Sequence, residues 1–350
     1  MKKIASVIFF AALCLSALAA YNPPAGGEDF NMLASPENLS GAKSVTGGAL
    51  FDAGADSVLV NPALSANEQR VNLNVGYTFM CTTNASDPNK VAHTFQTGIL
   101  IPFKLFIFSG YMNGIFCPFA DMNIGDAIDF RAGISKEIND KLYVGLSANG
   151  GFAWMNGTDW SLGADVGALY RHGKLAFIDD FRIGAAVLNL GKTYNLPRIG
   201  IQGYTANSQF PGFITVKAGV AGTMFSNSFL KIGLSFDVTT PCFQNLIFDT
   251  NAQIAIKDMF IISLGEKFNL MESINGHSSF IPSVAVLFKF TFDVKNNQYL
   301  EDNGWSQSEM KVSAGYKNFY NTVHAISAAA DIDLGMADNE PPSIKLWDNE

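Results

Sequence analysis

Four cationic side chains lie in segments where polar and apolar residues alternate: Arg131, Lys217, Lys231 and Lys289. A cation sheltered from water can hold a carboxylate by charge-assisted hydrogen bonds, while apolar residues around it hold a hydrocarbon chain. The four are therefore candidate ligand-binding residues. The alternative for each is an ordinary internal ion pair, or an anchor between two parts of the chain.

Catalytic chemistry has no comparable set of residues. The histidines are scattered, and none has a carboxylate or cysteine at ligand spacing: they are His93, His172, His277 and His324. The segment 145–149 lacks the final glycine of a nucleophile elbow, and no phosphate-binding or dinucleotide-binding fingerprint occurs. We expect no enzyme activity, no catalytic residue, no metal site and no cofactor.

The charge and the cysteine spacing limit the kinds of partner and site that this chain can have. The formal net charge is −8 and no basic cluster occurs, which argues against nucleic acid. Cys81, Cys117 and Cys242 match no metal or redox spacing. Cys81 and Cys117 could form a disulfide, and three unpaired thiols are the alternative.

The first residues predict export. Lys2 and Lys3 precede an apolar run over 4–15, and Ala17-Leu18-Ala19 provides a small-x-small cleavage site. The run is shorter than the ~20 apolar residues of a membrane-spanning helix. Residues 1–20 are therefore predicted to be a signal peptide, and the mature chain to reach the cell outer membrane.

Residues 71–334 carry repeated segments in which apolar and polar residues alternate. In a strand, successive side chains point to opposite faces, so alternation requires one apolar and one polar environment. Residues 160–170 are typical: the apolar members run from Trp160 to Tyr170, with Ser161, Gly163 and Asp165 between them. Repeated many times, this pattern predicts an all-β fold, a transmembrane antiparallel barrel.

We expect about fourteen strands, an even number as single-chain bacterial barrels require. Tight turns near Pro102, 139–141 and Ser226 alternate with longer loops, so the first strand should run outward. The link 295–307 is long where a short turn is expected, so either it is an exception or the count is wrong by one hairpin. The predicted strands are 71–81, 92–101, 104–113, 126–138, 142–154, 159–171, 178–190, 211–224, 227–239, 246–257, 258–268, 280–294, 308–319 and 322–334.

Residues 21–70 do not alternate and are rich in Gly, Ala, Asn and Pro, with scattered apolar residues. A disordered extension is the alternative, but the apolar content favours packing inside the barrel. We predict an N-terminal hatch, or plug, within the lumen. Residues 335–350 are polar with Pro341 and Pro342, and should form a periplasmic tail.

The hatch segment carries an ordered series of motifs: a Gly-rich stretch over 41–49, an acidic stretch over 52–56, and Val60-Asn61-Pro62-Ala63-Leu64. This resembles the N-terminal region of the long-chain fatty-acid transporter (FadL-like) family of outer-membrane barrels, and most closely its spirochaetal (treponemal) branch. The resemblance covers about the first eighty residues. It implies fourteen strands, a hatch in the lumen, and a hatch motif made of Asn61, Pro62 and Ala63.

In that family the hatch motif projects toward an inward kink of the third strand, which opens a lateral path to the bilayer. The resemblance places such a kink at Ser109-Gly110, since glycine often marks a bulge. The simpler interpretation of Asn61-Pro62 is a turn that redirects the chain into the first strand.

The resulting hypothesis is an outer-membrane channel that takes up hydrophobic small molecules, such as long-chain fatty acids, by diffusion through a plugged barrel. Its partners would be outer-membrane lipid and the hydrophobic ligand. The alternative is a structural or secretion-partner barrel without a transport role, which would bind other envelope proteins.

Overall fold

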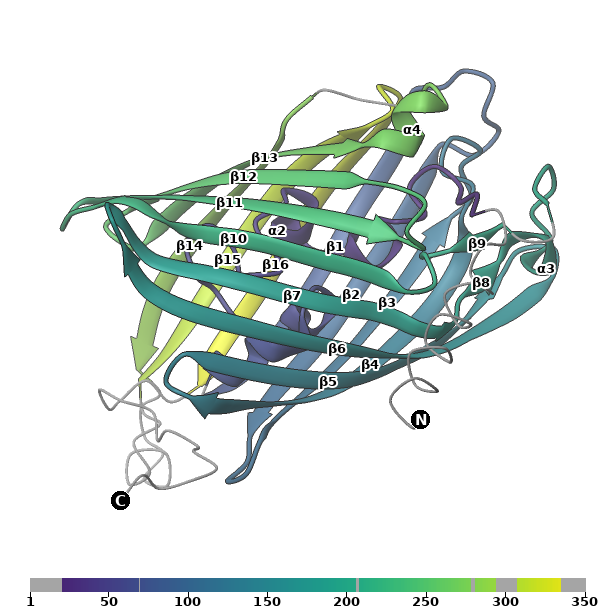
Figure 1. The fold of residues 1–350 in the computed structure, drawn as a ribbon. Helices are drawn as coiled ribbons and strands as arrows, with labels where there is room; N and C mark the ends of the chain where they lie inside the picture. Colours follow the sequence, from purple (N-terminus) through teal and green to yellow (C-terminus); the bar gives the residue numbers. More distant parts are fainter. Residues whose placement is uncertain (1–20, 69, 206–207, 278–280, 294–306, 335–350) are drawn as a thin grey trace, which may run out of the picture.

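The computed structural model describes residues 21–68, 70–205, 208–277, 281–293 and 307–334. Fourteen antiparallel strands form a closed barrel in which each strand pairs with its sequence neighbours and β1 pairs with β16 (Figure 1). The barrel strands are β1 (Val71–Thr82), β2 (Val91–Pro102), β3 (Ile107–Cys117), β4 (Gly125–Asn139), β5 (Leu142–Trp154), β6 (Thr158–Leu175), β7 (Ile178–Lys192), β10 (Thr215–Ser226), β11 (Leu230–Pro241), β12 (Ile247–Ile256), β13 (Phe260–Asn269), β14 (Ser283–Asp293), β15 (Gln307–Phe319) and β16 (Val323–Leu334).

Side-chain alternation in the strands separates an apolar exterior from a polar interior. On β6, Trp160 and Leu162 are 48% and 60% exposed, whereas Asp165 is fully buried. On β11, Phe236 faces outward and Asp237 is buried. Because the wall is closed, every strand has two hydrogen-bonded neighbours and no edge is left open in an apolar medium. The predicted barrel class and strand count are confirmed.

The two ends of the barrel differ in their connections. At the turn end, where β1 begins, the links β4–β5 and β12–β13 are tight; at the loop end, where β1 finishes, most links are longer. The link between β14 and β15 falls at the turn end, and its residues lie outside those described. Since fourteen strands form the barrel, that link is the exception and no hairpin was miscounted.

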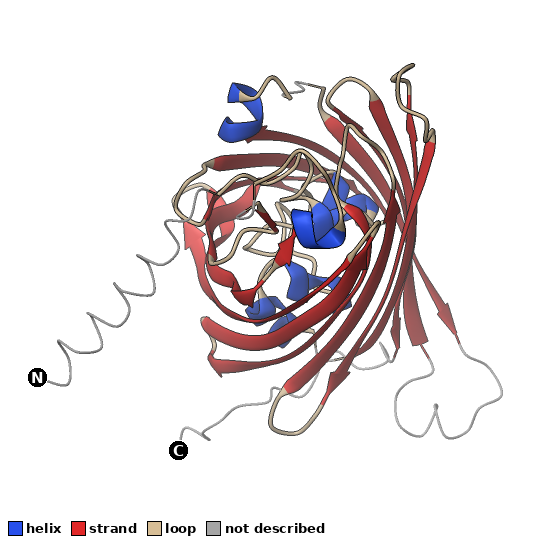
Figure 2. Ribbon diagram, turned by 90° about the vertical axis from the view of Figure 1, so that its right-hand side faces the viewer, coloured by secondary structure: helices blue, strands red, loops and turns tan. Residues whose placement is uncertain are grey.

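Residues 21–68, which we call the N-terminal segment, lie inside the ring of strands (Figure 2). Most of their side chains are buried, so the apolar content of this segment does serve packing within the barrel. The short helices are stabilised locally: Ser35 caps α2 by accepting from Asn38 N at 3.2 Å. The segment contains η1 (Phe30–Met32), α2 (Pro36–Leu39), η2 (Ala55–Leu59) and η3 (Pro62–Asn67).

An apolar cluster closes the loop end of the barrel over the N-terminal segment. The connection from β7 to β10 carries a two-stranded sheet of β8 (Tyr194–Asn195) and β9 (Gln209–Phe210), with α3 (Leu196–Ile199) between them. Phe30 packs edge-on against the rings of Tyr194 and Phe210, at centroid distances of 5.7 and 5.2 Å. A further helix, α4 (Leu270–Ile274), follows β13.

The proposed signal peptide, residues 1–20, and the proposed tail, 335–350, lie outside the described residues. Within the described part of the chain, no helix is long and apolar enough to cross a membrane.

Candidate functional site

Asn61 ties the N-terminal segment to the barrel wall. Its side chain is fully buried and caps η3, since Oδ1 accepts from Ala63 N at 3.0 Å. Its Nδ2 donates to Val45 O at 2.8 Å and to Ala168 O of β6 at 3.1 Å. The side-chain amide of Asn61 thus holds together the start of η3, the stretch of the segment around Val45 and the barrel strand β6. This is more than the simple turn that Asn-Pro alone predicts.

The hatch motif packs on β5 and β6. A Cβ atom at Gly145 of β5 would collide with the Pro62 carbonyl, and one at Gly167 of β6 would collide with the Asn61 side chain. Only glycine lets the backbone of the segment approach the wall so closely. The prediction that this motif faces the third strand near Ser109-Gly110 is wrong.

The predicted kink in β3 is also wrong. Ser109 and Gly110 pair in regular register with β2 (Leu100, Ile99) on one side and with β4 on the other, without a bulge. Gly110 instead faces outward and helps to line a broad apolar groove on the exterior of β2 to β6. Glycine here makes the outer surface hollow and does not interrupt the ladder.

Charge pairs fasten the N-terminal segment to the opposite side of the wall. Lys267 of β13 contacts Asp29 at 2.5 Å. Lys311 of β15 lies 2.6 Å from Asp52 of the segment and 3.3 Å from Asp333 of β16. These lysines were not singled out from the sequence, because nothing local distinguishes an inward lysine with a partner more than two hundred residues away.

Three of the four cations that were predicted to bind ligand form ion pairs with acidic side chains of the wall or its turns. Arg131 of β4 is buried and contacts Asp165 of β6 at 2.8 Å. Lys231 contacts Asp258 at 2.8 Å at the exposed turn end of β11, and Lys289 contacts Glu309 at 2.7 Å. These three are therefore wall ion pairs in this structure. The head-group assignment is not supported for Lys231, because it lies at the rim and far along β11 from the residues that line the lumen cavity.

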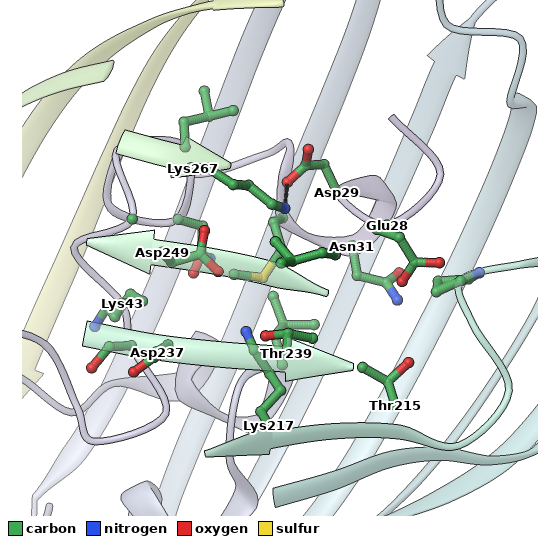
Figure 3. Close-up of a pocket in the computed structure, with 18 of the residues that line it drawn as sticks. Glu28, Asp29, Asn31, Lys43, Thr215, Lys217, Asp237, Thr239, Asp249 and Lys267 are labelled. Atoms are coloured by element: carbon green, nitrogen blue, oxygen red, sulfur yellow. Dashed lines mark hydrogen bonds and ion pairs between the residues drawn. The ribbon is translucent and has the colours of Figure 1, made fainter. Parts of the chain in front are cut away.

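Lys217 is different. Its side chain points into a cavity between the N-terminal segment and β10 to β15, together with Asp237 and Thr239 (Figure 3). No carboxylate of the described residues lies within ion-pair distance of its Nζ. Asp237 and Thr239 are buried, and Asp237 Oδ1 and Thr239 Oγ1 have no hydrogen-bond partner among the described residues. Buried polar atoms normally have partners, so this group is suited to hold a small polar group.

The same cavity is lined by five cations and five acids. The cations are Lys43, Arg131, Lys217, Lys267 and Lys317. Burial raises the pKa of Glu28 to about 8, although Lys267 opposes the shift, so Glu28 holds its proton more readily than an exposed glutamate does. Burial also acts to raise the pKa of Asp29, but the contact with Lys267 outweighs it and lowers that pKa to about 2. A negative group placed near Lys217 therefore meets less repulsion than the count of acids suggests.

The cavity is small. Its volume is about 80 Å³, and a second cavity beside Lys43 and Lys311 measures about 90 Å³. Ligand sites commonly measure about 300–1,000 Å³. A head group fits beside Lys217, but a long hydrocarbon chain does not fit without movement of the segment or the wall.

Cysteine and metal chemistry add no site. Cys81, Cys117 and Cys242 are all unpaired thiols. Cys117 is buried on the inner face of β3, whereas Cys81 alternates with the buried Met80 and faces outward. Being on opposite faces, the two cannot form the suggested disulfide. Within the described part of the chain, no cluster of His, Cys, Asp and Glu is arranged to hold a metal ion.

No protein-family model and no curated protein sequence matches the chain. Solved structures do. The Ralstonia pickettii toluene transporter TbuX matches with a TM-score of 0.51 and 12% identity, over 87% of this chain and 99% of that one. A deletion mutant of the TodX monoaromatic hydrocarbon channel matches with a TM-score of 0.50 and 10% identity, over 85% of this chain and 99% of that one. A Pseudomonas aeruginosa FadL homologue matches with a TM-score of 0.46 and 13% identity, over 86% of this chain and 97% of that one.

The chain has the TbuX fold. With its closed wall and apolar exterior, this TbuX-like barrel belongs in the outer membrane, as predicted. TbuX is a toluene transporter, and TodX is a monoaromatic hydrocarbon channel. At these identities the likeness establishes the fold alone. The treponemal branch and fatty-acid specificity remain predictions.

Proposed function

We propose that this barrel is an outer-membrane channel for hydrophobic molecules with an acidic head group, and that long-chain fatty acids are its substrates. The observation that carries the proposal is the cavity between the N-terminal segment and the wall, where no acidic side chain of the described residues forms an ion pair with Lys217. The TbuX-like fold supports a channel for hydrophobic compounds. The N-terminal segment acts as the hatch in this proposal, because it fills the lumen between the two ends.

Lys217 is the residue that we assign to the carboxylate. Two buried polar atoms that line the same cavity, Asp237 Oδ1 and Thr239 Oγ1, have no hydrogen-bond partner in the described part of the chain, and they can hydrogen-bond to a protonated or hydrated head group. Met32, Leu39 and Ile247 line the same cavity and would contact the first carbons of the chain. Because the remaining volume is small, passage requires the N-terminal segment to shift.

Binding of palmitate and of the uncharged hexadecanol to refolded protein tests this assignment. A charge-assisted contact contributes roughly 1.5–3 kcal/mol. The Lys217→Ala substitution should therefore lower the affinity for palmitate by about tenfold or more. Hexadecanol binding should change little. Lys231→Ala is the matched control, since that lysine lies on the same inward-facing pattern but is paired with Asp258 at the rim. Equal losses for both ligands, or equal effects of the two substitutions, would refute the head-group role of Lys217.

The second candidate is a structural or secretion-partner barrel without transport. It is favoured by one observation: the lumen is filled, and the cavities beside the N-terminal segment measure only about 80 and 90 Å³. Protein that binds neither palmitate nor hexadecanol saturably would favour this alternative.

A further inference from the structure

The lumen cavity that contains Lys217 has more acids than cations once its ion pairs are set aside. Three of its lining cations are paired within the protein: Lys43 with Asp52 and Asp56, Arg131 with Asp165, and Lys267 with Asp29. Among the described residues, the lining side chains without an ion pair are then two lysines, Lys217 and Lys317, and four acids, Glu28, Asp237, Asp249 and Glu266. A ligand that carries only negative charge leaves this excess of acids uncompensated.

Two of these acids face each other on neighbouring strands. Asp237 of β11 pairs directly with Asp249 of β12, and both line the cavity (Figure 3). The Cβ atoms of such a pair lie about 4.5–5.5 Å apart, and like charges in this position are unfavourable. Lys267 of β13 is the next residue in the row, but its ammonium contacts Asp29 at 2.5 Å. No cation of the described residues forms an ion pair with either carboxylate.

The surroundings of Asp237 leave one of its oxygens available to a ligand. Its side chain is buried, and Oδ2 accepts from Val45 N at 2.7 Å. Oδ1 has no hydrogen-bond partner in the part of the chain that the structure describes. A Cβ at Gly219 of β10 would collide with Oδ1, so glycine at this position makes room for the carboxylate. Buried polar atoms normally have partners, and an N–H donor of a ligand would supply the missing one.

Lys217 lies close to this carboxylate pair on the inner face of the wall. It precedes Gly219 by two residues on β10, a distance of about 7 Å along a strand. It also pairs with Thr239 of β11, which is two residues from Asp237 on the same face. The cavity therefore presents an ammonium group on one side and two carboxylates a short distance away. An anionic group and an amine joined by a short carbon bridge match this arrangement of charges.

We propose that the ligand of this cavity is a single-chain amphiphile with a zwitterionic head group, whose acidic group binds Lys217 and whose amine binds between Asp237 and Asp249. This inference rests on the proposed function and narrows its substrate class to acids that also carry an amine. An ammonium group has three N–H donors, so it can bond to both carboxylates at once. A plain fatty acid binds Lys217 but leaves the two carboxylates without a cation.

Two matched pairs of amphiphiles, bound to refolded protein, test for the amine site. Palmitoyl lysophosphatidylethanolamine differs from palmitoyl lysophosphatidate by its amine arm, and 2-aminopalmitate differs from palmitate by one amine. Wild-type protein should bind the amine-bearing member of at least one pair about tenfold or more tightly. The pair that shows this preference tells a phospholipid head group from an amino-acid head group. Equal affinities within both pairs would overturn the proposal.

Charge-neutral substitutions locate the site. Asp237→Asn and Asp249→Asn each remove one negative charge with little change of shape. Each should lower the affinity for the preferred amine-bearing ligand by about tenfold. Each should raise the affinity for its amine-free counterpart, because a nearby negative charge is gone. Asp258→Asn, at the exposed turn end, is the control and should change neither affinity.

The remaining outcomes separate this inference from the proposed function. If Asp237→Asn does not fold, Asp249→Asn alone decides the result. Equal losses for the amine-bearing and amine-free ligands in a folded variant would contradict the amine site. Wild-type protein that binds palmitate but shows no preference in either pair overturns the zwitterionic ligand and leaves the proposed function standing. Wild-type protein that binds none of the four ligands overturns both.

Discussion

Gly265 of β13 and Ser283 of β14 are paired in the barrel wall. On the inner side of this pair, Gly265 lies against Ser40 of the N-terminal segment. The segment thus rests on a paired part of the wall, so movement of one part affects the other.

The buried lysine that joins the N-terminal segment to the wall should be essential for stability. Lys311→Met leaves Asp52 and Asp333 without their short contacts to Nζ. Breaking a buried ion pair on one side costs about 3–5 kcal/mol. Lys174→Met removes an exposed pair with Asp179, and exposed pairs contribute about 0–1 kcal/mol. Urea unfolding of both variants in lipid vesicles measures the difference. A similar small loss for both would contradict the anchoring role of Lys311.

The strand pattern could be predicted from the sequence because each strand carries its own alternation. The prediction was least accurate for the third strand, expected at 104–113 and found at Ile107–Cys117. Phe103 and Phe106 are the reason: they are apolar but stand exposed in the β2–β3 turn, so hydrophobicity continues where the strand has ended.

The candidate site was harder to predict. Lys217 was found by alternation, but the same pattern selected Lys231, because alternation gives the face of a strand and not the position along the barrel. The contacts that fix the N-terminal segment, such as Lys267 with Asp29, join residues far apart in sequence. The glycines at 145 and 167 were also missed, since a single sequence does not show which glycine lies against another part of the backbone.

Asn61 should have a larger effect than its small side chain suggests. Asn61→Ala removes a helix cap, which contributes about 0.5–2 kcal/mol, and the two bonds from Nδ2. Asn61→Asp keeps the cap acceptor but loses both donated bonds, so it separates the anchor from the cap. Asn67→Ala, at the other end of η3 and only partly buried, is the control. Thermal unfolding should show larger losses for Asn61→Ala and Asn61→Asp than for Asn67→Ala; an Asn67→Ala loss as large as the others would count against the anchor.

Filling the space beside the hatch motif should displace the N-terminal segment and leave the barrel closed. Gly145→Ala places a methyl group against the Pro62 carbonyl, and overpacking of this kind costs about 1–3 kcal/mol. Gly110→Ala is the matched control on the outer face, where the nearest atoms to a new Cβ are 3.4 Å away. Limited proteolysis of the folded protein should cleave within residues 21–68 in Gly145→Ala and not in Gly110→Ala. Equal protection in both variants would show that the segment does not depend on this contact.

The central claim is that the barrel carries acidic hydrophobic molecules across the outer membrane. Its most direct test is the uptake of radiolabelled palmitate by cells that display the wild-type protein, Lys217→Ala or no barrel, at matched surface levels of the two proteins. The account predicts saturable uptake with the wild type, reduced uptake with Lys217→Ala, and background without the barrel. Uptake that is the same with and without the wild-type barrel would contradict it.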